Sequence, residues 1–225
     1  MFSGFRYHGF MRVIAGTYRS RPLEAPRGAS TRPTSDRLRE TLFNILQPRI
    51  AHSRFADLYA GTGAVGIEAL SRGASHVYFS ENSIHAIAAL RSNLASLKIT
   101  ANYTLEDRGT RALVERLHKL PPIDIVYLDP PWDAASDYES TLSFLGSARG
   151  LASLAPFAVV IAEHARKNLL SLTYGALEQY RLVQQGDAAL SFYHVPPPEE
   201  EPTDEPLQAD PAPSLPDSLP SVDSP

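Results

Sequence analysis

Residues 55–70 read Phe-Ala-Asp-Leu-Tyr-Ala-Gly-Thr-Gly-Ala-Val-Gly-Ile-Glu-Ala-Leu, and they indicate which architecture to expect. The run that begins at Phe55 has the length of a short buried strand, and the residues after the glycines have the pattern of an amphipathic helix. Gly61, Gly63 and Gly66 spell the turn G-x-G-x-x-G, in which a nucleotide ligand closely approaches the backbone at a helix start. The stretch therefore predicts an α/β domain that binds a nucleotide cofactor.

Strand-like and helix-like segments alternate after this turn, as a doubly wound sheet requires. Strands are expected at 76–80, 102–105, 123–128 and 157–162, and helices at 83–97, 110–119 and 138–150. Two later segments, 176–184 and 189–195, are expected to be closing strands. The sequence thus predicts a doubly wound sheet over residues 55–195.

A basic segment precedes this domain. Residues 1–54 contain ten arginines against three acidic residues, a net charge of +7, whereas residues 55–195 carry −3. Short strands are expected at 11–15 and 22–24, followed by a helix from Asp36 to Gln47 that Pro48 ends. Arg37 and Arg39 lie off the apolar stripe of this helix, so we expect both to be exposed. Such a charge pattern favours a phosphate-rich partner, although a solvated basic arm has the same composition.

Composition divides the chain into four parts: an extension at 1–10, a basic element at 11–54, the α/β domain at 55–195 and an acidic tail at 196–225. The tail has eight acidic residues, ten prolines and no Lys or Arg, so we expect it to be disordered. The absence of cysteine excludes disulfides, thiolate zinc sites and a cysteine nucleophile. No stretch has the pattern of a signal peptide or a membrane span, so the expected compartment is the cytoplasm.

The tetrapeptide Asp129-Pro130-Pro131-Trp132 directly follows the apolar strand 123–128. A carboxylate, a carbonyl on a chain stiffened by two prolines and a large aromatic face together suit a grip on the exocyclic amine of a flat base. The motif predicts methyl transfer to the amino group of a nucleobase. A strand that ends in an Asp-Pro turn for structural reasons alone is the plain alternative.

Carboxylates after successive strands help to distinguish two candidate cofactors. Asp57 lies just before the glycine turn, where a carboxylate attracts the ammonium of a methionine moiety and repels a pyrophosphate. Glu81 is placed for ribose hydroxyls, and Asp107 for the adenine amino group, although a plain acidic loop explains Asp107 equally well. With the motif at Asp129, these positions favour S-adenosylmethionine. An NAD enzyme and a glycine turn without a ligand are the alternatives.

Several blocks of the chain resemble the RsmD family, bacterial methyltransferases that modify the N2 amino group of a guanine in 16S ribosomal RNA. The similar blocks are residues 11–16 with 22–23, 31–37 running into 42–46, 57–74, 129–131 and 186–193. The block Thr-Arg-Pro-Thr-Ser-Asp-Arg at 31–37 is far more discriminating than the glycines. Two positions depart from the family: Trp132 replaces the usual Phe or Tyr, and Ala188 or Ala189 stands where Thr is usual.

This resemblance implies the Rossmann-like class I fold of S-adenosylmethionine-dependent methyltransferases, with seven mostly parallel strands, the last antiparallel, and a small β-rich N-terminal element. It also implies 16S rRNA as the partner, in a partly or fully assembled small ribosomal subunit. A monomer without a membrane anchor or a metal is expected. Five arginines are predicted to contact RNA phosphates: Arg32 and Arg37, with Arg12, Arg19 and Arg21 as weaker candidates.

The predicted chemistry starts from a poor nucleophile, because the lone pair of guanine N2 is delocalised into the ring. Asp129 and the Pro130 carbonyl are predicted to accept its two N–H bonds and to stabilise the growing positive charge. Trp132 is predicted to stack on the extruded base. The same grip serves adenine or cytosine, so a DNA amino-methyltransferase is an alternative. A non-catalytic RNA-binding assembly factor is another.

Overall fold

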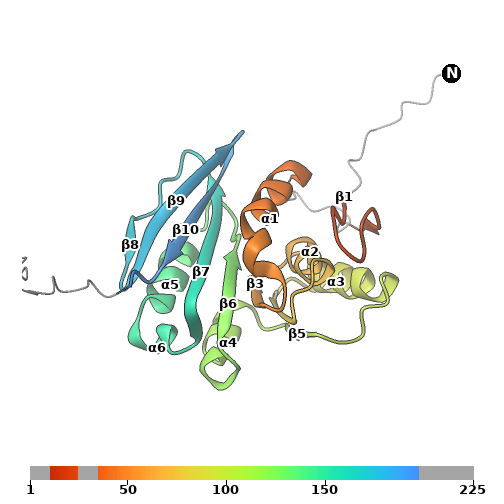
Figure 1. Ribbon diagram of the computed structural model, residues 1–225, viewed down its shortest axis with the longest axis horizontal. Helices are drawn as coiled ribbons and strands as arrows, with labels where there is room; N and C mark the ends of the chain where they lie inside the picture. Colours follow the sequence, from red (N-terminus) through yellow and green to blue (C-terminus); the bar gives the residue numbers. More distant parts are fainter. Residues whose placement is uncertain (1–10, 25–34, 198–225) are drawn as a thin grey trace, which may run out of the picture.

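The computed structural model describes residues 11–24 and 35–197 (Figure 1). An eight-stranded sheet in the order β5-β4-β3-β6-β7-β10-β9-β8 has helices on both faces, and β1 and β2 form a separate two-stranded sheet. The predictions for residues 1–10, for Arg32 and for residues 198–225 lie outside the described residues.

The strands are β1 (Met11–Arg12), β2 (Pro22–Leu23), β3 (Arg54–Leu58), β4 (His76–Ser80), β5 (Tyr103–Glu106), β6 (Ile123–Leu128), β7 (Leu154–Ala165), β8 (Thr173–Tyr174), β9 (Leu177–Gln185) and β10 (Ala188–His194). The helices are α1 (Asp36–Ile50), α2 (Ala64–Ser71), α3 (Ile84–Ser96), α4 (Thr110–Val114), α5 (Ala135–Leu145) and α6 (Ala148–Leu151), with the 3-10 helix η1 (Leu117–Lys119). These bounds confirm the predicted alternation, and the predicted helix at 110–119 is divided into α4 and η1.

The sheet confirms the predicted fold class. β5, β4, β3, β6 and β7 are parallel neighbours, and β10 pairs antiparallel with both β7 and β9. The two-residue strand β8 adds an eighth strand to the predicted seven, at the edge formed by β9. The chain runs from β3 outward to β5 and then returns to β6 on the other side of β3, so β3 and β6 form the switch point of the sheet.

A hydrophobic core lies on each face of the sheet. One contains Phe43 of α1 and Phe55 of β3, together with residues of α2 and α3. The other contains Leu128 of β6 and Leu142 of α5, together with residues of α4 and η1. Burial on both faces explains why β3 and β6 are almost continuously apolar in the sequence. No helix in the described ranges has the length and apolar character needed to cross a membrane.

Helix α1 corrects two predictions. It continues through Pro48 to Ile50, so the prediction that Pro48 ends it is wrong. Pro48 lies in the last turn, where its missing N–H removes one hydrogen bond, and the burial of Ile50 in the core favours the extra turn. Arg39 is fully buried and not exposed as predicted, because its guanidinium lies under the N-terminal element and donates to the Arg12 carbonyl. The predicted boundary at residue 54 stays a prediction.

Candidate active site

Four predicted carboxylates gather at the carboxyl edge of the sheet. Asp57 is the penultimate residue of β3, and Glu81, Asp107 and Asp129 directly follow β4, β5 and β6. Because these four strands are parallel neighbours, their carboxyl ends lie along one edge. The fold therefore unites side chains that are up to 72 residues apart in the sequence, Asp57 and Asp129 being the outermost pair.

Asp57 lies beneath the glycine turn and orients it. The side chain is 1% exposed, and its Oδ2 accepts the N–H of Gly66 at 2.8 Å. Burial raises the pKa of the Asp57 carboxyl to about 7. Gly63, which begins α2, has a φ of 80°, and a Cβ there would lie 2.1 Å from the Leu90 side chain, so the turn requires glycine.

Asp57→Asn is expected to change the free energy of unfolding of the ligand-free protein in favour of the folded state, relative to the wild type, by more at pH 8 than at pH 5. With a folded-state pKa of about 7 against an ordinary 3.8, the wild-type folded state keeps a proton that the unfolded state has released between these values. The wild-type free energy of unfolding therefore falls as pH rises through this window, and asparagine lacks this dependence. Urea unfolding of both proteins at the two pH values tests this. If the free energies of unfolding of the two proteins differ by the same amount at both pH values, the raised pKa of Asp57 is contradicted.

Gly61 faces open space beside a fixed carboxylate. Its φ is 55°, and a Cβ added there would meet no heavy atom of the protein within 4 Å. Glu81 accepts the Gly61 N–H through Oε2 and the N–H groups of Asn82 and Ser83 through Oε1, each at 2.8 Å. A carboxylate has about four acceptor sites, so the oriented Glu81 can still accept a ligand hydroxyl. The turn therefore fits a nucleoside cofactor.

Tyr59 is a residue that sequence reasoning missed. It links β3 to the glycine turn with a φ of 68°, which is rare for a bulky residue. Its hydroxyl lies 3.3 Å from the Thr141 hydroxyl of α5. Unusual backbone of this kind persists only where the surroundings fix it, and it commonly marks functional sites. Sequence reasoning missed Tyr59 because the pattern of apolar residues contains no signal for a positive φ.

Glu106 and Asp107, which are adjacent at the end of β5, differ in their surroundings. Glu106 is buried, and hydrogen bonds from Arg108 and then Arg116 lower its pKa to about 2. This carboxylate ties β5 to the segment before η1, which is a structural role. Asp107 is exposed and lies 3.3 Å from Arg91. Asp107 is thus the carboxylate of this pair that a ligand can reach.

The Asp129 motif is fixed to its neighbours through backbone groups. The Asp129 N–H donates to the Leu58 carbonyl of β3 at 3.4 Å. The buried hydroxyl of Tyr138 lies 3.1 Å from the Pro130 carbonyl oxygen and 2.9 Å from the Glu163 carbonyl oxygen, and its single proton is shared between these two acceptors. Tyr138 thereby joins the motif to β7 and leaves the second lone pair of the Pro130 oxygen for another donor.

The last two residues of the motif, Pro131 and Trp132, differ in exposure. Pro131 is exposed and Trp132 is half-buried. The Trp132 carbonyl accepts a hydrogen bond from the Asn168 side chain at 2.9 Å. The aromatic residue of the motif is therefore tied to the segment that follows β7.

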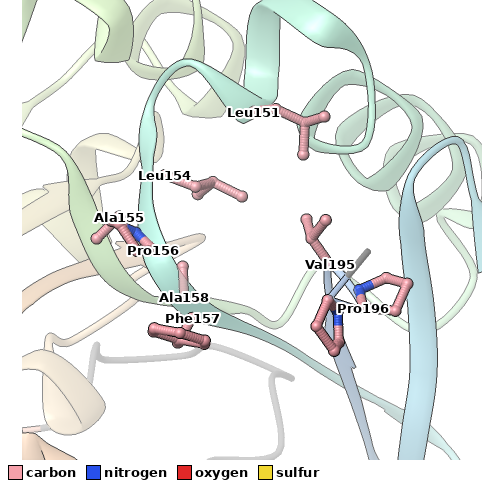
Figure 2. A pocket seen from close by; sticks show the side chains of 9 residues that line it. Leu151, Leu154, Ala155, Pro156, Phe157, Ala158, Val195 and Pro196 are labelled. Carbon is pink, nitrogen blue, oxygen red and sulfur yellow. The ribbon is translucent and has the colours of Figure 1, made fainter. Parts of the chain in front are cut away.

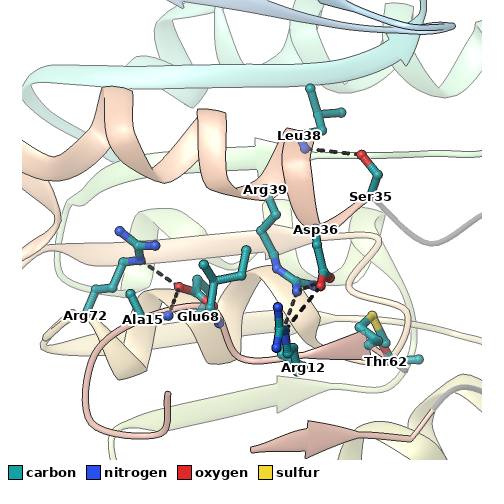
Figure 3. A network of polar contacts seen from close by, with 11 residues as sticks. Arg12, Ala15, Ser35, Asp36, Leu38, Arg39, Thr62, Glu68 and Arg72 are labelled. Carbon is teal, nitrogen blue, oxygen red and sulfur yellow. Dashed lines mark hydrogen bonds and ion pairs between the residues drawn. The ribbon is translucent and has the colours of Figure 1, made fainter. Parts of the chain in front are cut away.

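Buried Glu68 anchors the N-terminal element to α2 (Figure 3). Its carboxylate accepts the N–H groups of Ile14 at 2.7 Å and Ala15 at 2.9 Å, and it forms an ion pair with Arg72 at 2.7 Å. On the neighbouring helix α1, Arg39 donates to Asp36 at 2.9 Å. The contacts of Glu68 with Ile14 and Ala15 join residues near Met11 to α2, and the bond from Arg39 to the Arg12 carbonyl joins them to α1.

A second anchor, Asn93 of α3, connects the element directly to the turn. The side chain accepts the Glu24 N–H at 2.7 Å and donates to the carbonyls of Glu24 at 3.1 Å and Thr62 at 3.0 Å. Four predicted RNA-contacting arginines of this region are exposed: Arg12, Arg19, Arg21 and Arg37. The structure therefore places exposed cations on an element fixed beside the cofactor turn.

The apolar hollow of about 390 Å³ shown in Figure 2 lies at the opposite edge of the sheet. Its lining comes from α6, the start of β7 and the residues after β10, and includes Leu154, Phe157 and Val195. All its lining side chains are apolar, so it offers no group for acid–base or electrostatic chemistry. The candidate active site is therefore the carboxyl edge.

Comparisons with known proteins agree with this geometry. A family model described as conserved hypothetical protein 95 matches residues 11–194. "Ribosomal RNA small subunit methyltransferase D" from Escherichia coli (strain K12) is 40% identical over 124 residues, 55% of this chain and 61% of that protein. The chain belongs to the RsmD family.

Two further comparisons extend over most of the chain. "Putative rRNA methyltransferase YlbH" from Bacillus subtilis (strain 168) is 34% identical over 184 residues, 81% of this chain and 98% of that protein. A solved structure titled "Putative methyltransferase yhhF from Escherichia coli" has a TM-score of 0.69 and 32% identity, and the match covers 82% of this chain and 97% of that one. Membership of the RsmD family confirms the predicted methyltransferase fold and S-adenosylmethionine as the cofactor.

Proposed function

We propose that this protein transfers a methyl group from S-adenosylmethionine to the N2 amino group of a guanine in 16S rRNA. One observation carries the proposal. The Asp129 motif and the glycine turn follow adjacent strands, β6 and β3, and the Asp129 N–H is bonded to the Leu58 carbonyl. The groups suited to an amine and the turn suited to a nucleoside therefore meet at the switch point, where open α/β sheets bind ligands.

Five residues are proposed to contact the cofactor, which supplies a methyl group on a sulfonium and leaves as a neutral thioether. Gly61 and Gly63 allow close approach of the backbone. Glu81 accepts ribose hydroxyls, and Asp107 accepts the adenine amino group. Because Asp57 is almost fully buried, we propose that it meets the methionine ammonium through water.

The chain's own groups then act on the amine. We propose that Asp129 and the free lone pair of the Pro130 oxygen accept the two N–H bonds of guanine N2. Held in this way, the nitrogen is aimed toward the cofactor, and the carboxylate stabilises the positive charge that grows during transfer. Pro131 stiffens the loop, and the half-buried Trp132 stacks on the base. Asp129 accepts the proton that is lost.

RNA binding is proposed for the exposed arginines of the N-terminal element. The exposed residues Arg12, Arg19, Arg21 and Arg37 are proposed to meet phosphates, and Arg32 belongs to the same proposal from the sequence. The names of the relatives given above support ribosomal RNA of the small subunit as the partner. We further propose guanine 966 as the target, from the family resemblance. A monomer is proposed because one basic element serves one domain, and the cytoplasm because a chain without cysteine suits a reducing compartment.

The test is methyl transfer in vitro from labelled S-adenosylmethionine to three substrates: free 16S rRNA, small ribosomal subunits from cells that lack the gene, and duplex DNA. We expect label in ribosomal RNA, recovered as N2-methylguanine after nuclease digestion and mass spectrometry. Label in duplex DNA as methylated adenine or cytosine would support the DNA enzyme instead. RNA binding without label in any substrate would support the non-catalytic assembly factor.

A further inference from the structure

The connection from β7 to β8, residues 166–172, starts at the carboxyl edge of the sheet, the edge that carries Asp129. Its first two residues, Arg166 and Lys167, are exposed cations. Leu169 is 80% exposed and Leu172 is 70% exposed. The segment thus presents positive charge and apolar surface together, close to the motif proposed to grip the base.

A hydrogen bond fixes this connection to the motif. The Asn168 side chain donates to the Trp132 carbonyl at 2.9 Å, across 36 positions of sequence. Asn168 lies between the two cations and Leu169. The backbone of the connection therefore has a defined position relative to the backbone of Trp132.

Other contacts order both ends of the connection. At the start, the Arg166 N–H donates to the Asp187 carbonyl at 2.7 Å, and the Asn168 N–H donates to the Ala165 carbonyl at 2.9 Å. At the end, the Ser171 carbonyl accepts a hydrogen bond from the buried Tyr193 at 2.9 Å. An ordered backbone that still exposes a leucine and two cations is typical of a surface that has a partner.

Arg166 and Lys167 make no ion pair with the residues in the described ranges, whereas several other exposed arginines do. Arg91, for example, pairs with Asp107, and Arg111 pairs with Glu115. Two exposed cations on a segment that is bonded to the Trp132 backbone favour a polyanion with bases, because phosphates meet the cations and bases meet the apolar surface of Leu169 and Leu172.

Along the sheet, the connection and residues 11–24 of the N-terminal element lie on opposite sides of the Asp129 motif. The element is anchored to α2 and α3, which pack on the half of the sheet that contains β3 and β4, whereas the connection follows β7. Resting on the function proposed above, we propose that Arg166, Lys167 and Leu169 form a second RNA-binding surface for the single strand that flanks the target base. RNA would then be bound on both sides of the extruded guanine.

The test is a double variant, Arg166→Ala with Lys167→Ala, assayed for binding to 16S rRNA across a range of salt concentrations. We expect RNA affinity at low salt to fall about tenfold or more. The plot of log affinity against log salt should become shallower, its slope losing roughly 1.4 in magnitude, about 0.7 for each lost contact to a single strand. Leu169→Ala is expected to weaken binding without changing the slope. S-adenosylmethionine affinity reports that each variant is folded.

A matched control removes the same charge from the opposite edge of the sheet. Lys119→Ala with Arg149→Ala, both exposed in η1 and α6 ahead of β6 and β7, is expected to leave affinity and slope unchanged. If the Arg166 and Lys167 variant behaves like this control while the wild type methylates rRNA, the second surface is refuted and the proposed function stands. If the wild type binds RNA with the predicted dependence on these two residues but methylates nothing, the surface stands and the proposed function fails.

Discussion

Replacing Asp129 with asparagine is expected to slow methyl transfer by about 10²–10³-fold, the usual loss when one group that stabilises transition-state charge is removed. Asparagine keeps the size of the side chain and the Asp129 N–H bond to Leu58, so the loop should retain its shape. It removes the negative charge beside the nitrogen at the moment when that nitrogen becomes positive. Single-turnover rates at saturating RNA and cofactor measure this step, and calorimetry should show an unchanged affinity for S-adenosylmethionine.

Asp133→Asn is the matched control, because Asp133 is exposed, lies four residues further along the same loop and loses the same charge. We expect this variant to react at the wild-type rate. A near-normal rate for the Asp129 variant would remove that carboxylate from the mechanism. Equal slowing of both variants would show that the loop needs general negative charge and not a specific acceptor.

Local patterns in the sequence predicted the fold and the outline of the site. The glycine turn and the Asp129 motif each combine a buried strand with a turn inside about ten residues, so their structure depends on neighbours in the chain. Parallel strands then bring Asp57, Glu81 and Asp129 to one edge whatever lies between them. The closing strand at 189–195 was also predicted from the sequence, but its antiparallel direction came only from the family resemblance, because strand direction leaves no periodic signal.

The anchors of the N-terminal element were not predictable in this way. The partners of Arg39, Glu68 and Asn93 lie 27, up to 54 and 69 positions away in the sequence. A helical pattern shows which face is apolar, and a polar residue off that face is taken to be exposed. Arg39 is buried because the segment around Arg12 packs over α1, and this contact between distant parts of the sequence leaves no local pattern. The Asn168 contact with Trp132 escaped prediction for the same reason.

Glu68→Gln is expected to destabilise the protein by about 3–5 kcal/mol, the usual cost of leaving a buried charge without its partner. Arg72, whose side chain is 8% exposed, would lose its carboxylate, and one of the amide groups of Ile14 and Ala15 would face the new NH₂ group. For a domain of this size, such a loss lowers the melting temperature by roughly 10 °C. Thermal and urea unfolding measure it directly.

The same variant also tests whether Glu68 fixes the N-terminal element in particular. If it does, trypsin should cleave after the exposed Arg19 faster than in the wild type, under conditions where the sheet stays folded. Glu115→Gln is the control, because Glu115 pairs with Arg111 at 3.0 Å on the surface, where solvent screens the charges and little stability is lost. Similar unfolding curves for the two variants would mean that the buried carboxylate contributes no more than a surface ion pair. Faster cleavage together with weaker RNA binding would instead link the anchor to the orientation of the basic element beside the cofactor turn.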